Sequence, residues 1–217
     1  MQQLSHPTLC LVTDRLRCNG RRIEDIVDAA VEGGVGMVQL REKDLPASDL
    51  YSLALRIRKV VGKRALLFIN DRVDIALAVG ADGVQLGENA LPLEAARQVS
   101  GSSLLLGRSV HSVVGALEAE ANGADMLTLG TIFPTASHPG AYTGGSPLVQ
   151  EVAAAVSVPF LGIGGIDASN AANVIAGGAA GAAVITAITM APDPAVAAST
   201  LLEKMRTASV PTPLEAR

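Results

Sequence analysis

Two positions in the sequence carry side chains that could move a proton. His111 follows an apolar run, and an imidazole can donate or accept a proton close to neutral pH. Asp71 follows another apolar run, directly after Asn70, and a carboxylate can accept a proton. His111 could equally be a structural hydrogen-bonding residue, and Asn70 and Asp71 could cap the following helix.

A second group of side chains could bind an anion. Gln39, Arg41 and Lys43 occupy alternate positions, so they face the same way if the chain there is extended. Arg and Lys side chains are common ligands of phosphate groups, although these two could also form a solvated face. The spacing therefore predicts contact with a small anionic substrate.

Two stretches near the C-terminal end of the chain are typical of a phosphate site. Gly164-Gly165 and Thr186 each follow a short apolar run. Backbone N–H groups at strand ends and helix starts can hold an anion without a buried cation. We therefore expect a phosphate to bind to the N–H groups of Gly164, Gly165, Ile185 and Thr186.

All of these residues follow apolar runs that alternate with segments of helical periodicity. The pattern predicts strands over 9–14, 37–43, 65–69, 83–87, 104–109, 126–130, 160–163 and 182–185. It predicts helices over 23–31, 51–61, 73–79, 92–99, 113–121, 148–156 and 194–205, and a further helix that ends at Gly177 and is capped by Asp167 or Ser169. The long segment 131–147 is expected to be an active-site loop.

Eight such units in 217 residues, or about 27 residues each, predict an α/β fold of one domain, a (β/α)8 TIM barrel. We expect residues 1–208 to form the barrel and 209–217 a flexible C-terminal tail. The alternative, an open doubly wound sheet, needs fewer units and usually a different glycine pattern near its start. In a TIM barrel the C-terminal strand ends meet at one mouth, and the loops after the last two strands usually bind phosphate.

Composition excludes several classes of protein. The net charge of −4 argues against a nucleic-acid partner. Two cysteines, Cys10 and Cys18, are too few for a disulfide framework, and the N-terminus lacks the pattern of a signal peptide. The weakly polar stretch 174–191 is broken by Gly177-Gly178, which indicates a helix end plus a strand rather than a membrane span. We expect a cytoplasmic protein without a membrane partner, possibly a homo-oligomer.

Six short motifs occur in order along almost the whole chain. They are Gln39-Leu-Arg41-Glu-Lys43, Ile69-Asn70-Asp71, Val84-Gln85-Leu-Gly87, Ser109-Val-His111, Gly130-x3-Pro134-Thr135 and Gly162-Ile-Gly164-Gly165-Ile166. Together they resemble the thiamine-phosphate synthase superfamily, which has a synthase branch and a thiazole tautomerase branch. The resemblance implies a (β/α)8 barrel acting on a hydroxyethylthiazole phosphate in thiamine biosynthesis. It implies substrate-binding roles for Gln39, Arg41, Lys43, Asn70, Ser109, Thr135, His138 and Gly144.

Two departures from the family pattern bear on the branch. The synthase resembled here ionises a pyrimidine pyrophosphate, and the family neutralises the departing pyrophosphate with Mg²⁺ on two aspartates and with basic side chains. Asp71 matches the first aspartate, but the second, in a Gly-Gln-x-Asp pattern, is replaced by Ala90. Glu88 lies two positions early, and His138 stands where the family has a lysine, where it could also be an ordinary loop residue.

A tautomerase needs neither the metal ligands nor the extra basic side chains, because one acid/base can move a proton from a ring carbon to the exocyclic carbon of a carboxythiazole phosphate. His111 or Asp71 could supply it. The sequence therefore predicts a thiazole tautomerase-like enzyme that uses no cofactor or metal. The first alternative is the synthase, with Mg²⁺ on Asp71. The second is a non-catalytic protein that binds a phosphate ligand or has a regulatory role.

Overall fold

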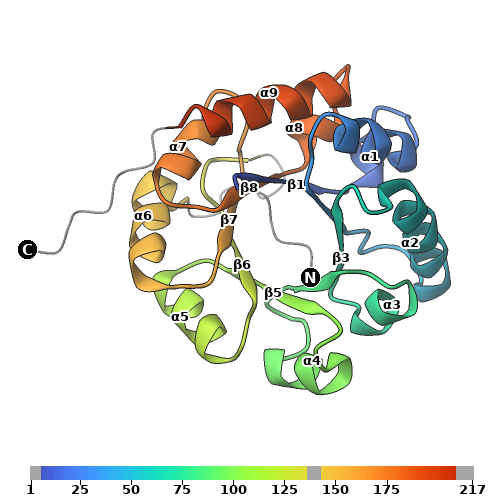
Figure 1. The fold of residues 1–217 in the computed structure, drawn as a ribbon, viewed down its shortest axis with the longest axis horizontal. Helices are drawn as coiled ribbons and strands as arrows, with labels where there is room; N and C mark the ends of the chain where they lie inside the picture. Colours follow the sequence, from blue (N-terminus) through green and yellow to red (C-terminus); the bar gives the residue numbers. More distant parts are fainter. Residues whose placement is uncertain (1–5, 136–142, 209–217) are drawn as a thin grey trace, which may run out of the picture.

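The computed structural model describes residues 6–135 and 143–208, in which eight parallel strands form a closed barrel (Figure 1). Neighbouring strands pair in chain order, and β8 closes the ring against β1, with Cys10 opposite Ala183. The predicted (β/α)8 TIM barrel is confirmed. The strands are β1 Thr8–Val12, β2 Met37–Leu40, β3 Leu66–Asn70, β4 Gly83–Leu86, β5 Leu105–Val110, β6 Met126–Leu129, β7 Phe160–Ile163 and β8 Gly181–Val184.

The helices form a ring outside the strands (Figure 1). A short 3-10 helix, η1, spans Arg15–Arg17 after β1. The α-helices are α1 Ile23–Glu32, α2 Ala47–Val61, α3 Val73–Ala78, α4 Leu93–Ser100, α5 Val113–Ala121, α6 Gly145–Ala155, α7 Ala171–Ala176, α8 Thr186–Thr189 and α9 Pro194–Arg206.

The sequence-based bounds are wrong at a few element ends. β2 stops at Leu40 rather than Lys43, and the chain turns there and buries a carboxylate, Glu42, against Thr13 in the segment after β1. Helix α6 begins at Gly145, before the expected Leu148, so the preceding loop is shorter than predicted. The short helix α8 was not predicted, since four residues are too few to show a periodicity.

The helix α7 also starts differently from the prediction. Its N-cap is Asn170, without a side-chain cap, whereas Asp167 accepts hydrogen bonds from the backbone nitrogen and the hydroxyl of Ser169. Asn170 reaches back instead, and its Nδ2 donates to the carbonyl oxygen of Gly165 at 2.9 Å. These contacts hold the loop that follows β7 rather than the start of the helix.

Side chains alternate between the inside of the barrel and the layer beneath the helices. Inside, a small apolar cluster includes Cys10, Met37, Phe68 and Met126. A Cβ added to Gly83 would lie 2.4 Å from Cε1 of Phe68, so the glycine makes room for the largest of these side chains. Nearer the C-terminal strand ends, the inward side chains become polar, and they are Gln39, Asn70, Gln85, Ser109 and Thr128.

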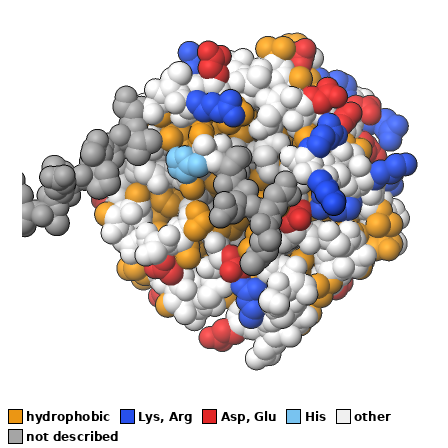
Figure 2. Space-filling model, in the orientation of Figure 1, with side chains coloured by type: hydrophobic (Ala, Val, Ile, Leu, Met, Phe, Trp, Pro, Cys, Tyr) orange, Lys and Arg blue, Asp and Glu red, His pale blue; other side chains and the backbone are white. Residues whose placement is uncertain are grey.

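At the other end of the barrel, two aspartates make the same pair of hydrogen bonds, one to a strand and one to an arginine. Asp82 Oδ2 accepts hydrogen bonds from Leu67 N and from Arg58, each at 2.7 Å. Two units later, Asp125 Oδ2 accepts from Leu106 N at 2.7 Å and from Arg97 at 2.5 Å. On the face drawn in Figure 2, Lys and Arg side chains lie beside Asp and Glu side chains along the edge.

Both cysteines are free and buried, as the sequence indicated for Cys10. Burial raises the pKa of the Cys10 thiol to about 12, so it packs as a small hydrophobic side chain. The stretch 174–191 forms the end of α7, then β8 and α8. Within residues 6–135 and 143–208, no helix has the length and apolar character needed to span a membrane.

Candidate active site

The C-terminal strand ends surround a cavity of about 290 Å³, here called the mouth cavity. Arg41 and Lys43 reach it from the loop after β2, although the strand alternation used to predict this ends at Leu40. The prediction that these cations lie near the other polar groups is therefore correct, but the loop after β2, and not an extended strand, brings them there. The lining residues are Val12, Gln39, Arg41, Lys43, Asn70, Asp71, Gly87, Glu88, Asn89, Ser109, His111, Thr128, Ile163 and Ile185.

A chain of hydrogen bonds orients the carboxylate of Asp71 at the edge of this cavity. Gln39 Nε2 donates to Asn70 Oδ1 at 2.9 Å, and Asn70 Nδ2 donates to Asp71 Oδ2 at 2.8 Å. The other oxygen, Oδ1, accepts from the backbone nitrogen of Gly87 at 2.8 Å. Each carboxylate oxygen keeps further lone-pair capacity, so Asp71 can still bind a cation or accept a proton.

The backbone at Asp71 is also unusual, with φ of 60° in the left-handed region. This conformation costs a non-glycine residue energy, and such outliers are concentrated at functional sites. The alternative reading of Asp71 as a helix cap does not hold. Arg72 occupies the N-cap position of α3, and its side chain forms no capping hydrogen bond.

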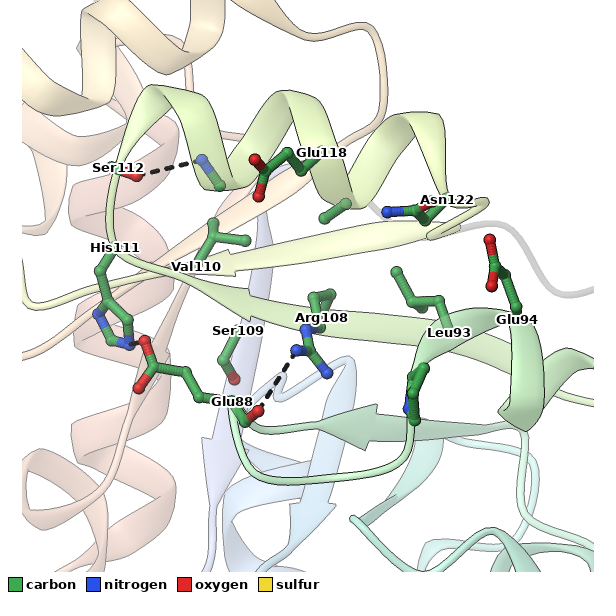
Figure 3. Close-up of a pocket in the computed structure, with 13 residues that line it drawn as sticks. Glu88, Leu93, Glu94, Arg108, Ser109, Val110, His111, Ser112, Glu118 and Asn122 are labelled. Carbon is green, nitrogen blue, oxygen red and sulfur yellow. Dashed lines mark hydrogen bonds and ion pairs between the residues drawn. The ribbon is translucent and has the colours of Figure 1, made fainter.

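His111 lines the mouth cavity and also the two further cavities described below. Its Nδ1 contacts the carbonyl oxygen of Gly130, which can only accept, so Nδ1 carries a proton. Its Nε2 is 3.4 Å from Oε1 of Glu88, and Figure 3 shows the two side chains facing one another. Close by, Gln85 Nε2 donates to Ser109 Oγ at 3.1 Å, so the Ser109 hydroxyl proton remains available to another acceptor.

A second cavity, of about 150 Å³ and here called the rim cavity, lies at the ends of β7 and β8. Gly164, Gly165, Ile185 and Thr186 line it together with Thr131, Thr135 and His111. Within the described part of the chain, the backbone N–H groups of Gly164, Gly165, Thr186 and Ala187 donate no hydrogen bond. The position matches the phosphate site common to TIM barrels, beside a short extra helix after the last strand.

Gly165 is required for a reason that the sequence did not reveal. Its φ is 60°, and a Cβ there would lie 2.4 Å from the carbonyl oxygen of Pro134 and 2.7 Å from that of Phe133. The glycine therefore allows the loop after β7 to pack against the loop after β6. A side chain at this position would therefore meet the backbone of the neighbouring loop whether or not a phosphate is bound.

A third cavity, of about 360 Å³, lies outside the strands between α4 and α5 (Figure 3). Arg108 points into it, and one of its nitrogens, Nη1, is buried without a partner among the described residues. Glu88, Glu94 and Glu118 also line it. Three carboxylates against one guanidinium disfavour a phosphate, so the mouth and rim cavities are the better site for an anionic substrate.

Not all predicted site residues lie at these cavities. Gly144 precedes α6 and lines none of them, and a Cβ there would lie 2.2 Å from Leu148 Cδ2, so the glycine leaves room for that side chain. His138 lies outside the described residues. The sequence reading missed Gln85 and Thr128, although their alternation with buried residues of β4 and β6 was a usable signal.

The residues described contain no cluster of three or more His, Cys, Asp or Glu side chains suited to a metal ion. Ala90, where the resemblance expects a carboxylate, is half-buried and packs against the hydrophobic core. A metal at the mouth would therefore depend on Asp71 and on groups that arrive with the substrate.

Comparison with known proteins identifies the family. A sequence profile described as thiamine monophosphate synthase matches residues 9–188. The chain belongs to this family. It is 45% identical over 196 residues to a thiamine-phosphate synthase of Haloarcula marismortui, covering 88% of this chain and 93% of that protein. It is 46% identical over 200 residues to a putative thiamine-phosphate synthase of Geobacter sulfurreducens, covering 90% and 92%.

A solved structure from the same family has the same fold. Thiamine phosphate pyrophosphorylase from Pyrococcus furiosus superposes with a TM-score of 0.86 at 37% identity, covering 93% of this chain and 96% of that one. For this member of the thiamine monophosphate synthase family, the comparisons support the broader prediction of an enzyme of thiamine biosynthesis. They favour the synthase alternative over the tautomerase that the sequence reading preferred.

Proposed function

We propose that this protein is a thiamine-phosphate synthase, which joins hydroxymethylpyrimidine pyrophosphate to hydroxyethylthiazole phosphate. The observation that carries the proposal is the similarity of about 45% across nearly the full length of proteins with that name. In the reaction, the bond between the exocyclic carbon and the pyrophosphate oxygen breaks. The thiazole nitrogen then forms a bond to that carbon, and pyrophosphate leaves.

The mouth cavity is suited to the pyrophosphate end of the first substrate. Arg41 and Lys43 can neutralise phosphate oxygens, and their charge matters most as the carbon–oxygen bond breaks and negative charge grows on the leaving group. Gln39 and Asn70 offer amide groups beside them. Ser109 can donate its hydroxyl proton to the pyrimidine or to a phosphate oxygen.

The rim cavity is suited to the phosphate of the second substrate. Gly164, Gly165 and Thr186, whose backbone N–H groups donate to no acceptor among the described residues, line this small cavity, whose size suits one phosphate better than a pyrimidine pyrophosphate. Because His111 lines both cavities, it lies between the two substrates. This arrangement would place the thiazole ring beside the carbon it attacks.

Magnesium fits these residues when it arrives with the pyrophosphate. Mg²⁺ is usually held by one or two carboxylates plus substrate phosphates, and Asp71 supplies one carboxylate with spare lone pairs. Asp71 would hold the ion, which when bound would help to neutralise the departing pyrophosphate. The replacement of the second aspartate by Ala90, which the sequence reading took to favour the tautomerase, is therefore compatible with the synthase.

The test is to supply both substrates with Mg²⁺ and to measure thiamine phosphate, and separately to supply the carboxythiazole phosphate tautomer and measure its isomerisation. We expect thiamine phosphate to form. Isomerisation without any coupling would instead support the tautomerase. Binding of thiazole phosphate with neither reaction would support the non-catalytic alternative.

A further inference from the structure

Glu42 is a buried acid between the two cations of the mouth cavity. It is 5% exposed, whereas Arg41 and Lys43 on either side line that cavity. Within residues 6–135 and 143–208, it is the one Asp, Glu, Lys or Arg that is buried. Burial raises the pKa of its carboxyl group, which shows that the charged form is disfavoured there. A position that only filled space would be served better by an apolar residue.

Among the described residues, the side-chain hydrogen bonds of Glu42 all lead to the segment that follows β1. Thr13 Oγ1 donates to Glu42 Oε1 at 2.7 Å, and the backbone nitrogen of Arg15 lies 3.2 Å from each carboxylate oxygen. The carboxylate therefore ties the loop after β2 to the loop after β1. Next to it, the side chain of Arg15 pairs with Asp44 at the surface.

Thr13 extends this link to the backbone of Arg41. The hydroxyl of Thr13 has one proton, which goes to Glu42, so its lone pair is free to accept. It accepts from the backbone nitrogen of Arg41 at 3.0 Å. The backbone nitrogen of Thr13 in turn donates to the carbonyl oxygen of Gln39 at 3.0 Å. Glu42 thus fixes the direction of the Thr13 hydroxyl and, through it, the point from which the Arg41 side chain extends.

We propose that Glu42 is a positioning residue that acts through Thr13 to hold Arg41 and Lys43 in place for the pyrophosphate group. That the anion is a pyrophosphate rests on the proposed function. The link between Glu42 and the two cations rests on the hydrogen bonds alone.

Removing the charge of Glu42 should change the affinity for an anion in opposite directions, depending on whether Glu42 acts by its charge or by holding the cations. Glu42 carries a negative charge close to an anion site, so its removal by Glu42→Gln should tighten anion binding if only charge matters. If Glu42 holds the cations in place, Glu42→Gln should weaken binding, because its single amide oxygen can still accept from Thr13 but its NH₂ group, a donor, would then face the backbone N–H of Arg15.

The experiment is calorimetric titration of the full chain with inorganic pyrophosphate at fixed Mg²⁺. We expect Glu42→Gln and Thr13→Val each to raise the Kd about tenfold, and Thr13→Ser, which keeps the hydroxyl, to stay near the wild type. The matched control is Asp44→Asn, which removes one negative charge from the same loop without touching Thr13 or Arg41. It should leave the affinity unchanged or tighten it. Unchanged or tighter binding in both Glu42→Gln and Thr13→Val would overturn the proposal.

A double variant tests whether Glu42 acts through the cations. In an Arg41→Ala/Lys43→Ala background, Glu42→Gln should have little further effect on the Kd. A full tenfold loss in that background would show that Glu42 acts elsewhere and would also overturn the proposal. Thermal unfolding of each variant checks that it is folded, and Thr13→Val tests the link if Glu42→Gln does not fold.

The same titrations separate this proposal from the proposed function. If Arg41→Ala/Lys43→Ala binds pyrophosphate as well as the wild type, the assignment of the anion is wrong. That result would contradict both the proposed function of the mouth cavity and the positioning role of Glu42. If that variant loses affinity while Glu42→Gln and Thr13→Val do not, only the role of Glu42 is wrong.

Discussion

Oδ1 of Asp71 accepts a hydrogen bond of 2.8 Å from the backbone nitrogen of Gly87, which joins the end of β3 to the end of β4. Asp71→Asn can keep this bond, because its amide oxygen can still accept, but the negative charge is lost. We expect kcat/KM for thiamine phosphate formation to fall about 10²-fold, through loss of the metal-holding carboxylate. Asp74→Asn, which removes an exposed charge from α3, is the matched control. Equal activity of the two variants would remove Asp71 from the site.

His111 distinguishes the two branches of the family. Coupling the two substrates needs no proton shuttle on the protein, whereas isomerisation does. His111→Asn should therefore lower the synthase rate by less than about tenfold, since removal of a general acid/base costs about 10²–10⁴-fold. Steady-state rates of the folded variant provide the measurement. A loss of 10³-fold or more in the synthase rate would show that His111 takes part in the chemistry.

Thr186 offers a cleaner test of the rim cavity than the glycines. Its side chain is exposed at the start of α8, so Thr186→Val removes a hydroxyl without disturbing packing. We expect the Kd for thiazole phosphate to rise about three- to tenfold, the loss of one hydrogen bond. Thr207→Val, at the end of α9, is the control. No change in Kd would exclude the Thr186 hydroxyl from phosphate binding.

Gly165→Val is expected to destabilise the fold as well as the site. Its φ of 60° and the carbonyl oxygen of Pro134, 2.4 Å from the added Cβ, both oppose a side chain there. We expect a loss of about 2 kcal/mol or more in the free energy of unfolding, measured by denaturant titration. Wild-type stability in this variant would show that the two loops can separate without cost.

Asp167 should make the stability of the loop after β7 depend on pH. The hydroxyl and the backbone nitrogen of Ser169 both donate to it and lower its pKa. Its contribution is therefore present above the pKa of an unfolded aspartate, about 3.9, and is lost as the pH falls through the lower folded value. Asp167→Asn should lower the Tm by more at pH 7 than at pH 2. An equal difference in Tm at both pH values would contradict this.

The sequence alone determined the order and type of almost every element. The bounds predicted for α5 and β7 are those observed, because buried parallel strands appear as continuous apolar runs and the helices between them as periodic ones. Since parallel strands present their C-terminal ends together, the same reading located the polar residues that meet at the mouth.

Tertiary structure alone decided which of these side chains touch and what they do. Glu42 looks like one more charge beside Arg41 and Lys43 in the sequence, but the turn after Leu40 buries it against Thr13. Similarly, the sequence places Gly165 at a phosphate site, and only the structure shows that a Cβ there would also lie 2.4 Å from the carbonyl oxygen of Pro134 in the loop after β6. Hydrogen-bond partners far apart in the chain leave no periodic signal, since the barrel's closure, rather than local spacing, brings them together.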